Sequence, residues 1–148
     1  MRKSASGFTL VELAIVIVVM SILATVTVSA FIDVQARARD AQRDAAVSTI
    51  RKALDTYRVA NGGYPTPCAN VNQDCYIDYL TSYLSPKYVS AMPVPSKVQS
   101  LAEPSKFFNN GGTTSYTMLI FYESKPSCRL GVDISPTYYS SYPLCPNF

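Results

Sequence analysis

The sequence predicts an α+β fold, in which one long N-terminal helix packs on a small antiparallel sheet. Three observations lead to this prediction. An uncharged apolar run extends from Leu13 to Ile32, a stretch without glycine or proline continues from Asp33 to Asn61, and the C-terminal third is rich in aromatic and branched residues. The helix is therefore expected to be apolar all round in its first half and amphipathic in its second half.

The apolar run is long enough to cross a membrane as a helix. Its twenty residues carry no charge, and at 1.5 Å per residue they span the roughly 30 Å of a hydrocarbon core. Its only polar members are Ser21, Thr25, Thr27 and Ser29. Glu12 stands at the start of this run, where an unpaired carboxylate costs about 1–3 kcal/mol. A charge in such a place indicates a function.

A short basic leader precedes the apolar run. It ends at Gly7 and contains Arg2 and Lys3, which fit a cytoplasmic N-terminus. An ordinary secretory signal has an apolar stretch of about 7–15 residues and then a cleavage site of small residues. This run is longer and no such site follows it, so composition alone indicates an uncleaved anchor.

Residues 33–60 predict the amphipathic half of the helix, because apolar residues recur at spacings of three and four. The spacing is seen first in Val34, Ala38, Ala41 and Ala45, and then in Val47, Ile50, Leu54 and Tyr57. The basic residues, Arg43 among them, are expected mainly on other faces, with Asp40 three residues before Arg43. Asn61-Gly62-Gly63 and the following Pro65 and Pro67 end the helix.

Residues 61–112 are expected to form a loop region with one short helix, Ile77–Leu84. Beyond it, Thr114–Tyr122 predicts a strand because it is rich in aromatic and branched residues. Cys128–Ile134 predicts a second strand because apolar and polar residues alternate.

Two further features complete the predicted sheet. Glu123–Pro126 is the turn between its strands, and Tyr138–Tyr142 is a candidate third strand. The sheet is expected to bury Ile50, Leu54 and Tyr57 of the helix.

The composition argues against an enzyme. The 148 residues leave room for one globular domain, and none is histidine, which removes histidine-based acid–base catalysis and histidine metal sites. Removing Arg2 and Lys3 from the thirteen basic residues leaves eleven against ten acidic ones, so no surface for nucleic acid is expected. Serine and lysine occur in no recognisable nucleophile motif, and no cofactor is expected.

Four cysteines predict disulfides in an oxidising compartment, which would place residues 33–148 outside the cytoplasm. Their spacings are not those of a zinc ribbon or a thioredoxin-like site. Of three possible pairings, Cys68–Cys75 and Cys128–Cys145 are favoured, because each pair flanks a loop rich in turn residues. The second would contribute about 3 kcal/mol. Free buried cysteines are the alternative.

The segment Gly7-Phe8-Thr9-Leu10-Val11-Glu12-Leu13 resembles the processing signature of type IV prepilins and of the pseudopilins of type II secretion. The signature consists of a short basic leader, glycine at the junction, phenylalanine next, glutamate four residues later, and then the apolar run. The resemblance implies that a prepilin peptidase cleaves between Gly7 and Phe8 on the cytoplasmic side. It also implies N-methylation of the new terminus at Phe8.

The resemblance divides the chain into a leader (1–7), a transmembrane and assembly helix (8–32) and a pilin head domain (33–148). The head comprises an amphipathic helix (33–60), a loop region (61–112), and a sheet with a C-terminal disulfide loop (113–148). Leu54–Thr66 and Tyr83–Pro93 are also similar to this family and are expected to build the head domain rather than to bind anything.

The resemblance gives Glu12 a role in assembly. Cleavage frees an α-amine at Phe8, and Glu12 of one subunit is expected to pair with the Phe8 amine of another. A buried carboxylate and ammonium are tolerated only as a pair, so this contact would set the axial register. Ser21 and Ser29 stand where many pilins have glycine and proline, so local melting of the helix in a filament has less cause here.

Three further features could indicate a binding site, but each has a simpler structural explanation. Asn109-Asn-Gly-Gly112 lacks the lysine and helix of a phosphate-binding loop, so a hairpin or loop tip is favoured. Asp74, Asp78 and Asp133 are candidate calcium ligands, but no dense acidic run follows Pro126, so no metal site is expected. Core packing and surface contacts explain the eleven tyrosines and six phenylalanines.

These features predict a structural filament subunit of a type IV pilus or a similar filament. The alternative within the family is a pseudopilin of a type II secretion or DNA-uptake machine, and a third hypothesis is a monomeric binding module on an uncleaved anchor. The expected partners are copies of the chain and other pilins, a prepilin peptidase, a membrane assembly platform, and membrane lipid before assembly. The expected location is the cytoplasmic membrane, and then an extracellular or periplasmic filament.

Overall fold

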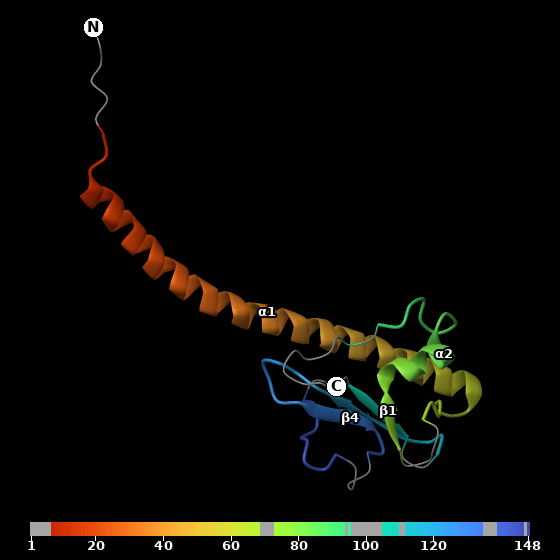
Figure 1. Ribbon diagram of the computed structural model, residues 1–148. Helices are drawn as coiled ribbons and strands as arrows, with labels where there is room; N and C mark the ends of the chain where they lie inside the picture. Colours follow the sequence, from red (N-terminus) through yellow and green to blue (C-terminus); the bar gives the residue numbers. More distant parts are fainter. Residues whose placement is uncertain are drawn as a thin grey trace. The chain divides into compact units, whose positions relative to one another are not determined.

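The computed structural model describes residues 7–68, 73–93, 95, 105–109, 112–134, 139–146 and 148, without the side chains of residues 26–30. Its elements are α1 (Leu10–Asn61), β1 (Asp74–Tyr76), the 3₁₀ helix η1 (Ile77–Leu80), α2 (Thr81–Leu84), β2 (Lys106–Asn109), β3 (Tyr116–Ile120) and β4 (Cys128–Val132) (Figure 1). The long helix and the antiparallel sheet confirm the predicted α+β fold. The chain divides into two compact units, Met1–Ala36 and Arg37–Phe148.

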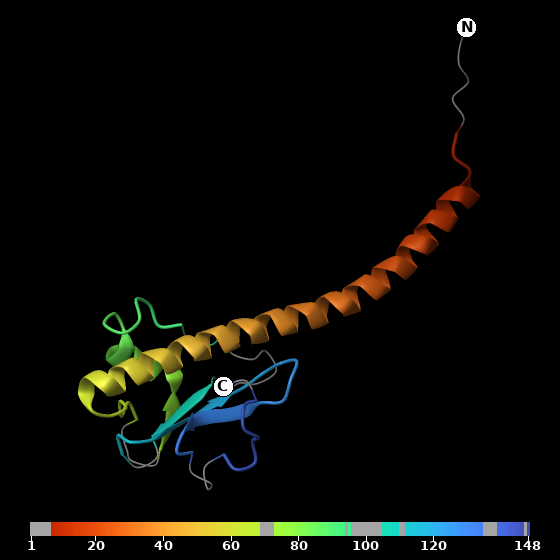
Figure 2. The same ribbon diagram turned by 180° about the vertical axis from the view of Figure 1, so that it is seen from behind.

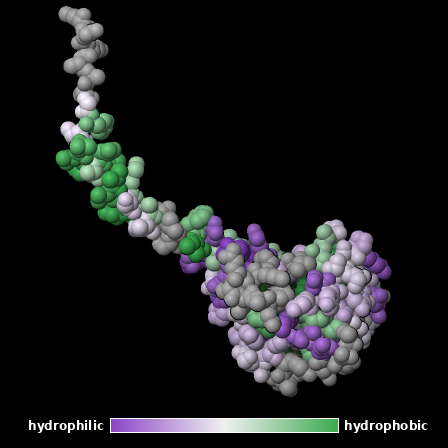
Figure 3. All heavy atoms as spheres, in the orientation of Figure 1, coloured by the Kyte–Doolittle hydropathy of each residue, from purple (hydrophilic) through white to green (hydrophobic). Residues whose placement is uncertain are grey.

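In the N-terminal unit, α1 carries apolar side chains on every side. Each described residue from Gly7 to Thr25 is exposed, including Leu10, Ile15 and Leu23. Figure 3 shows the dense apolar surface of this helix. Over the residues whose side chains are described, no helix is both long enough and apolar enough to span a membrane.

α1 ends where glycine allows the backbone to turn. Gly62 has a φ of +79°, a left-handed conformation that a side chain disfavours, and its N–H donates to the carbonyl of Arg58 at 2.8 Å. The side-chain amide of Asn61 donates to the carbonyl of Tyr57 at 2.8 Å. The predicted helix stop is therefore confirmed.

The sheet of the C-terminal unit is a four-stranded antiparallel meander in the order β1-β2-β3-β4 (Figure 2). Its register places Cys75, Phe107, Met118 and Leu130 side by side across the four strands. These side chains belong to the main core, so they define the inner face of the sheet. β3 and β4 lie within the two segments predicted as strands.

β1 and β2 lie in the segment that was expected to be loop, 61–112. β1 has three residues, too few to show an alternating pattern. Three of the four residues of β2 are buried, so exposed and buried residues do not alternate there. The predicted short helix at Ile77–Leu84 is present as η1 followed directly by α2.

The C-terminal unit has one main core between α1 and the inner face of the sheet. From α1, Val47, Ile50 and Leu54 are fully buried, whereas Tyr57 is only half-buried. The core is completed by residues from the loops, the short helices and the sheet: Tyr64, Ile77, Leu80, Leu84, Phe107, Tyr116, Met118, Ile120 and Leu130. The expectation that a sheet covers this face of the helix is confirmed.

The first set of regularly spaced apolar residues on α1 does not lie on the face that the sheet covers. Val34, Ala38, Ala41 and Ala45 are all exposed. Positions 45 and 47 lie about 200° apart around a helix of 3.6 residues per turn, so the two sets cannot share one face. The buried face instead continues from Val47 toward the N-terminus through two charged residues, Arg43 and Asp40.

The predicted third strand at Tyr138–Tyr142 is wrong. Residue 138 lies outside the described residues, and Tyr139–Tyr142 form a turn in which the N–H of Tyr142 donates to the carbonyl of Tyr139 at 2.9 Å. Leu144 makes a parallel bridge to Arg129 of β4 instead. The side chains of Tyr139 and Tyr142 in this turn pack over Leu119 and Phe121 on the outer face of the sheet.

Two disulfides, Cys68–Cys75 and Cys128–Cys145, stabilise the C-terminal unit. They are the pairing favoured from the sequence, and all four cysteines are bonded. The first attaches the chain after α1 to β1, and the second attaches the C-terminal segment to the start of β4.

Candidate functional site

The predicted cleavage site lies in exposed backbone just before α1. Gly7, Phe8 and Thr9 precede the first helical residue, Leu10, and all are exposed. A side chain at Gly7 would meet nothing within 4 Å, and Phe8 exposes 87% of its surface. Both residues of the predicted scissile bond are accessible, and residues 1–6 of the expected leader lie outside the described residues.

Thr9 and Glu12 form a reciprocal cap at the start of α1. The backbone N–H and the hydroxyl of Thr9 donate to Oε2 of Glu12 at 3.0 and 2.8 Å. The N–H of Glu12 in turn donates to Oγ1 of Thr9 at 3.2 Å. This pattern is a capping box, which satisfies N–H groups that have no partner within the helix.

The cap gives Glu12 a role in the single chain that the sequence analysis missed. The signal was readable, because threonine followed three residues later by glutamate, just before an apolar run, is typical of a helix start. Both Thr9 bonds end on the same carboxylate oxygen, Oε2, so the cap itself does not use Oε1.

Beyond the cap, the side chains of α1 form a shallow apolar groove lined by Leu10, Val11, Ala14, Ile15, Val18 and Val19. The polar residues that follow do not interrupt the apolar surface. The hydroxyl of Ser21 donates to the carbonyl of Ile17 at 2.6 Å, and that of Thr25 donates to the carbonyl of Ile22 at 2.7 Å. This surface therefore fits an apolar covering better than water.

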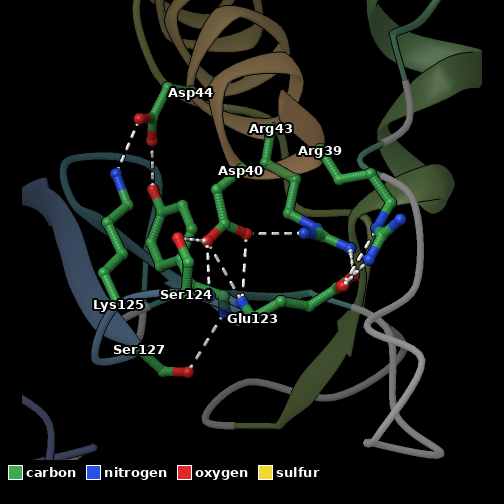
Figure 4. Close-up of polar contacts among 9 residues, drawn as sticks. Arg39, Asp40, Arg43, Asp44, Glu123, Ser124, Lys125 and Ser127 are labelled. Carbon is green, nitrogen blue, oxygen red and sulfur yellow. Dashed lines mark hydrogen bonds and ion pairs between the residues drawn. The ribbon is translucent and has the colours of Figure 1, made fainter. Parts of the chain in front are cut away.

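A second polar site lies in the C-terminal unit, where α1 meets the turn after β3 (Figure 4). Arg43 is fully buried and bridges two carboxylates, that of Asp40 at 2.6 Å and that of Glu123 at 2.5 Å. Arg39 makes a second contact with Glu123 at 2.5 Å, but 28% of its side chain is exposed. The predicted Asp40–Arg43 pair is present, although it is buried and not on a solvent-facing side of the helix.

Asp40 fixes the backbone of the turn. Its carboxylate accepts hydrogen bonds from the N–H of Glu123 at 3.0 Å, from the N–H of Ser124 at 2.8 Å and from the Ser124 hydroxyl at 2.7 Å. Burial raises the pKa of Asp40, but these bonds and the one from Arg43 outweigh burial, so its pKa lies below the usual value. Hydrogen bonds from Arg39 and then Arg43 likewise hold the pKa of Glu123 below its usual value, against burial.

Asp44, one turn further along α1, holds the other side of the same turn. The phenol of Tyr122 donates to Oδ1 of Asp44 at 2.5 Å, and Nζ of Lys125 lies 2.6 Å from Oδ2. Burial, followed by the hydrogen bond to Asp44, raises the pKa of Tyr122, so this phenol remains a donor. Lys125 also lies 4.1 Å from the centre of the Tyr122 ring. The charged groups of this cluster bind one another, so we assign the cluster a structural role.

Two other candidates from the sequence, Asp74 and Asn109, make structural contacts. No three described metal-ligating side chains lie close enough to hold an ion. Asp74 pairs with Lys106 at 3.0 Å and accepts from the phenol of Tyr139 at 3.2 Å. Asn109 is buried at the end of β2 and accepts from the N–H of Gly112 at 2.9 Å. β2 pairs with β3, so this segment connects a hairpin, as predicted; residues 110 and 111 lie outside the described residues.

Residues 2–28 match the family described as the prokaryotic N-terminal methylation motif. Over 62 residues, 42% of this chain, the sequence is 44% identical to the type IV narrow pilus major component PilA5 of Thermus thermophilus, of which it covers 53%. Over 96 residues, 62% of this chain, it is 30% identical to the type II secretion system core protein G of Aeromonas hydrophila, of which it covers 67%.

A protein of the same name from Klebsiella michiganensis is 37% identical over 65 residues, which cover 44% of this chain and 46% of that protein. The chain thus spans about half the length of the pilus component and of the Klebsiella protein, and two thirds of the Aeromonas protein. No solved structure matches the chain.

Replacing Arg43 by methionine tests the structural role of the buried cluster. Arg43→Met leaves Asp40 and Glu123 buried without their shared guanidinium, so we expect the free energy of unfolding to fall by about 3–5 kcal/mol. Arg39→Met removes a partly exposed contact, and about 1 kcal/mol or less should be lost. Urea denaturation of the full chain in detergent measures both, and equal losses would contradict the assignment.

The same cluster should make the stability of the protein depend on pH. The pKa values of Asp40 and Glu123 are depressed in the folded protein, so the unfolded chain takes up protons first as the pH falls. Their stabilisation is fully present above the unfolded-state pKa values of about 4, and it is lost as the pH falls through the lower folded-state pKa values. We expect Glu123→Gln to flatten the fall in unfolding free energy between about pH 5 and pH 2. If the unfolding free energy of this variant fell with pH as steeply as that of the wild type, Glu123 would not contribute to the pH dependence.

Proposed function

Because the chain belongs to the family of type IV pilins and type II secretion pseudopilins, we propose that it is a structural filament subunit of a type IV pilus or a similar filament. In this proposal residues 8–32 first anchor the chain in the cytoplasmic membrane and then form the core of the filament. The head, residues 33–148, lies outside the cytoplasm, where its two disulfides are stable. The partners are copies of the chain, other pilins and a membrane assembly platform. No catalytic role is proposed.

The observation that carries this proposal is the exposed apolar helix of the N-terminal unit. Most of the described large apolar residues expose more than half of their surface there, among them Leu10, Ile15 and Leu23. Transfer of apolar surface out of water is favourable by about 25 cal/mol per Å². This surface is therefore more stable against lipid or another apolar helix than in water. The same side chains therefore support both an anchored and a polymerised state.

The geometry around Gly7 and Phe8 supports processing at this bond. A peptidase needs extended and accessible backbone on both sides of the bond it cleaves, and both residues lie exposed before the first turn of α1. Cleavage between them by a prepilin peptidase would free the amine of Phe8, the proposed site of N-methylation. The match of residues 2–28 to the methylation motif supports the same proposal.

Glu12 is the proposed register contact. The cap holds Oε2 of Glu12 against Thr9, which fixes the direction of the carboxylate at the start of the helix. Oε1 takes no part in the cap, so the Phe8 ammonium of a second copy can approach it. Both charges would otherwise remain unpaired among apolar helices, so an axial shift of one subunit would be penalised.

The second candidate is a pseudopilin of a type II secretion or DNA-uptake machine, and the match to the core protein G of Aeromonas hydrophila favours it. The two candidates share the same subunit chemistry and differ in the length and cargo of the filament. Electron microscopy and mass spectrometry of filaments sheared from the native cell separate them. A long filament built mainly of this chain supports the pilus subunit, and absence of the chain from such filaments supports the pseudopilin.

Processing is tested by the N-terminus of the protein isolated from its native cell. We expect N-terminal sequencing and intact-mass measurement to find a chain that begins at Phe8 with a methylated amine. The six residues of the leader before Gly7, and Gly7 itself, should be absent. A retained Met1 with an unmodified Phe8 would instead support the uncleaved anchor.

The register contact is tested by a substitution that keeps the cap. Glutamine also fits the third helical position of a capping box, so Glu12→Gln removes the charge while the helix start is preserved. Loss of one partner of a buried ion pair costs about 3–5 kcal/mol, so we expect filament yield to fall by more than about tenfold.

The matched control for this test is Thr9→Ala, which weakens the cap but keeps the carboxylate. It should assemble better than Glu12→Gln, with helix content followed by circular dichroism. Wild-type assembly of Glu12→Gln would exclude the register role and leave the filament proposal standing.

A further inference from the structure

The outer face of the sheet is covered unevenly. Tyr139 and Tyr142 of the C-terminal segment pack over Leu119 and Phe121, and Tyr139 also contacts Phe108 of β2 and Asp74 of β1. β1 is at one edge of the sheet and has three residues (Figure 1). Tyr76, the last residue of β1, points to the outer face, because Cys75 beside it belongs to the core.

A groove of about 350 Å³ lies at this edge, within the roughly 300–1,000 Å³ typical of small-molecule sites. It is lined by Gln73, Asp74, Cys75, Tyr76, Tyr79 and Lys106. The rings of Tyr76 and Tyr79 are 6.3 Å apart at an angle of 72°, so they form two differently oriented walls. Tyr76 exposes 43% of its surface and Tyr79 exposes 54%, whereas Tyr64 and Tyr116 are buried. Core packing therefore does not account for this pair.

The polar part of the groove is fixed in place. Oδ2 of Asp74 lies 3.0 Å from Nζ of Lys106 and accepts a hydrogen bond from the phenol of Tyr139 at 3.2 Å. The disulfide between Cys75 and Cys68 holds the strand that carries Asp74 and Tyr76. A carboxylate beside an ammonium presents an acceptor and a donor at hydrogen-bonding distance from each other, with no net charge.

We propose that this groove binds a neutral saccharide. Neighbouring hydroxyl groups of a sugar act as both donors and acceptors, so one pair of them can satisfy Asp74 and Lys106 together. The C–H faces of the sugar ring pack on the rings of Tyr76 and Tyr79, which are rigid and lose little conformational entropy. The paired charges disfavour an anion, which the Asp74 carboxylate would repel, and a purely apolar ligand, which would remove water from both charges without replacing its hydrogen bonds.

The test uses the full chain in a detergent without a sugar headgroup, with cellobiose and N,N′-diacetylchitobiose as probes. Saturation-transfer NMR is expected to show contact through the C–H protons of the sugar, with a dissociation constant of about 1 mM, as suits a shallow and open site. The double variant Tyr76→Ala/Tyr79→Ala should weaken binding at least tenfold. Tyr79→Phe keeps the ring and should bind within about twofold of the wild type.

Tyr83→Ala is the matched control, because Tyr83 is 36% exposed on the neighbouring α2 but does not line the groove. It should leave binding unchanged, and thermal unfolding checks that every variant is folded. Absence of transfer to both disaccharides at about ten times the expected dissociation constant would overturn the proposal. Binding that survives in the double variant would overturn it too, as would self-association of the chain that depends on the two tyrosines.

Discussion

The apolar surface of α1 in the N-terminal unit must be covered by something other than water. Among the described residues, the main hydrophobic cluster takes its α1 members from Val47 onward and the smaller cluster takes none from α1, whereas the described apolar side chains between Phe8 and Thr25 are exposed. A helix that is apolar all round is stable in lipid or among other apolar helices. Membrane anchoring and polymerisation are therefore two ways of covering one surface. The capping box of Thr9 and Glu12 suits both, because it satisfies the N–H groups of these two residues at the helix start where water is scarce.

In the C-terminal unit, α1 is covered by the sheet and the turn after β3. From Val47 to Leu54 the sheet is held by apolar packing, but toward residue 40 the buried positions of α1 are charged. Asp40 and Arg43 are tolerated there because Glu123 and the backbone of the following turn complete their hydrogen bonds. Apolar contacts are not directional, whereas these bonds are. The cluster therefore fixes where the turn after β3 sits along α1, and the apolar core supplies most of the burial.

The parts of the fold that could be predicted from the sequence are those governed by local rules. The helix stop at Gly62, the cysteine pairing and the strands around Met118 and Leu130 follow from turn chemistry, spacing and periodicity. The burial of Arg43 could not be predicted, because its partner Glu123 is 80 residues away along the chain. β1 and β2 are too short or too evenly buried to show a pattern. The Thr9–Glu12 cap could have been predicted from the sequence, but Glu12 was interpreted there only as a proposed assembly contact.

We propose that copies of the chain cover the apolar surface of α1 in a filament, and thiol labelling measures this cover. All four native cysteines are in disulfides, so single cysteines at Val18 or Ser140 would be the reactive thiols. In intact filaments, Val18→Cys is predicted to resist a water-soluble maleimide and to react fully once the filaments are dissociated, whereas Ser140→Cys reacts in both states. Equal labelling of the two positions in intact filaments would show that the apolar surface of α1 is not covered there.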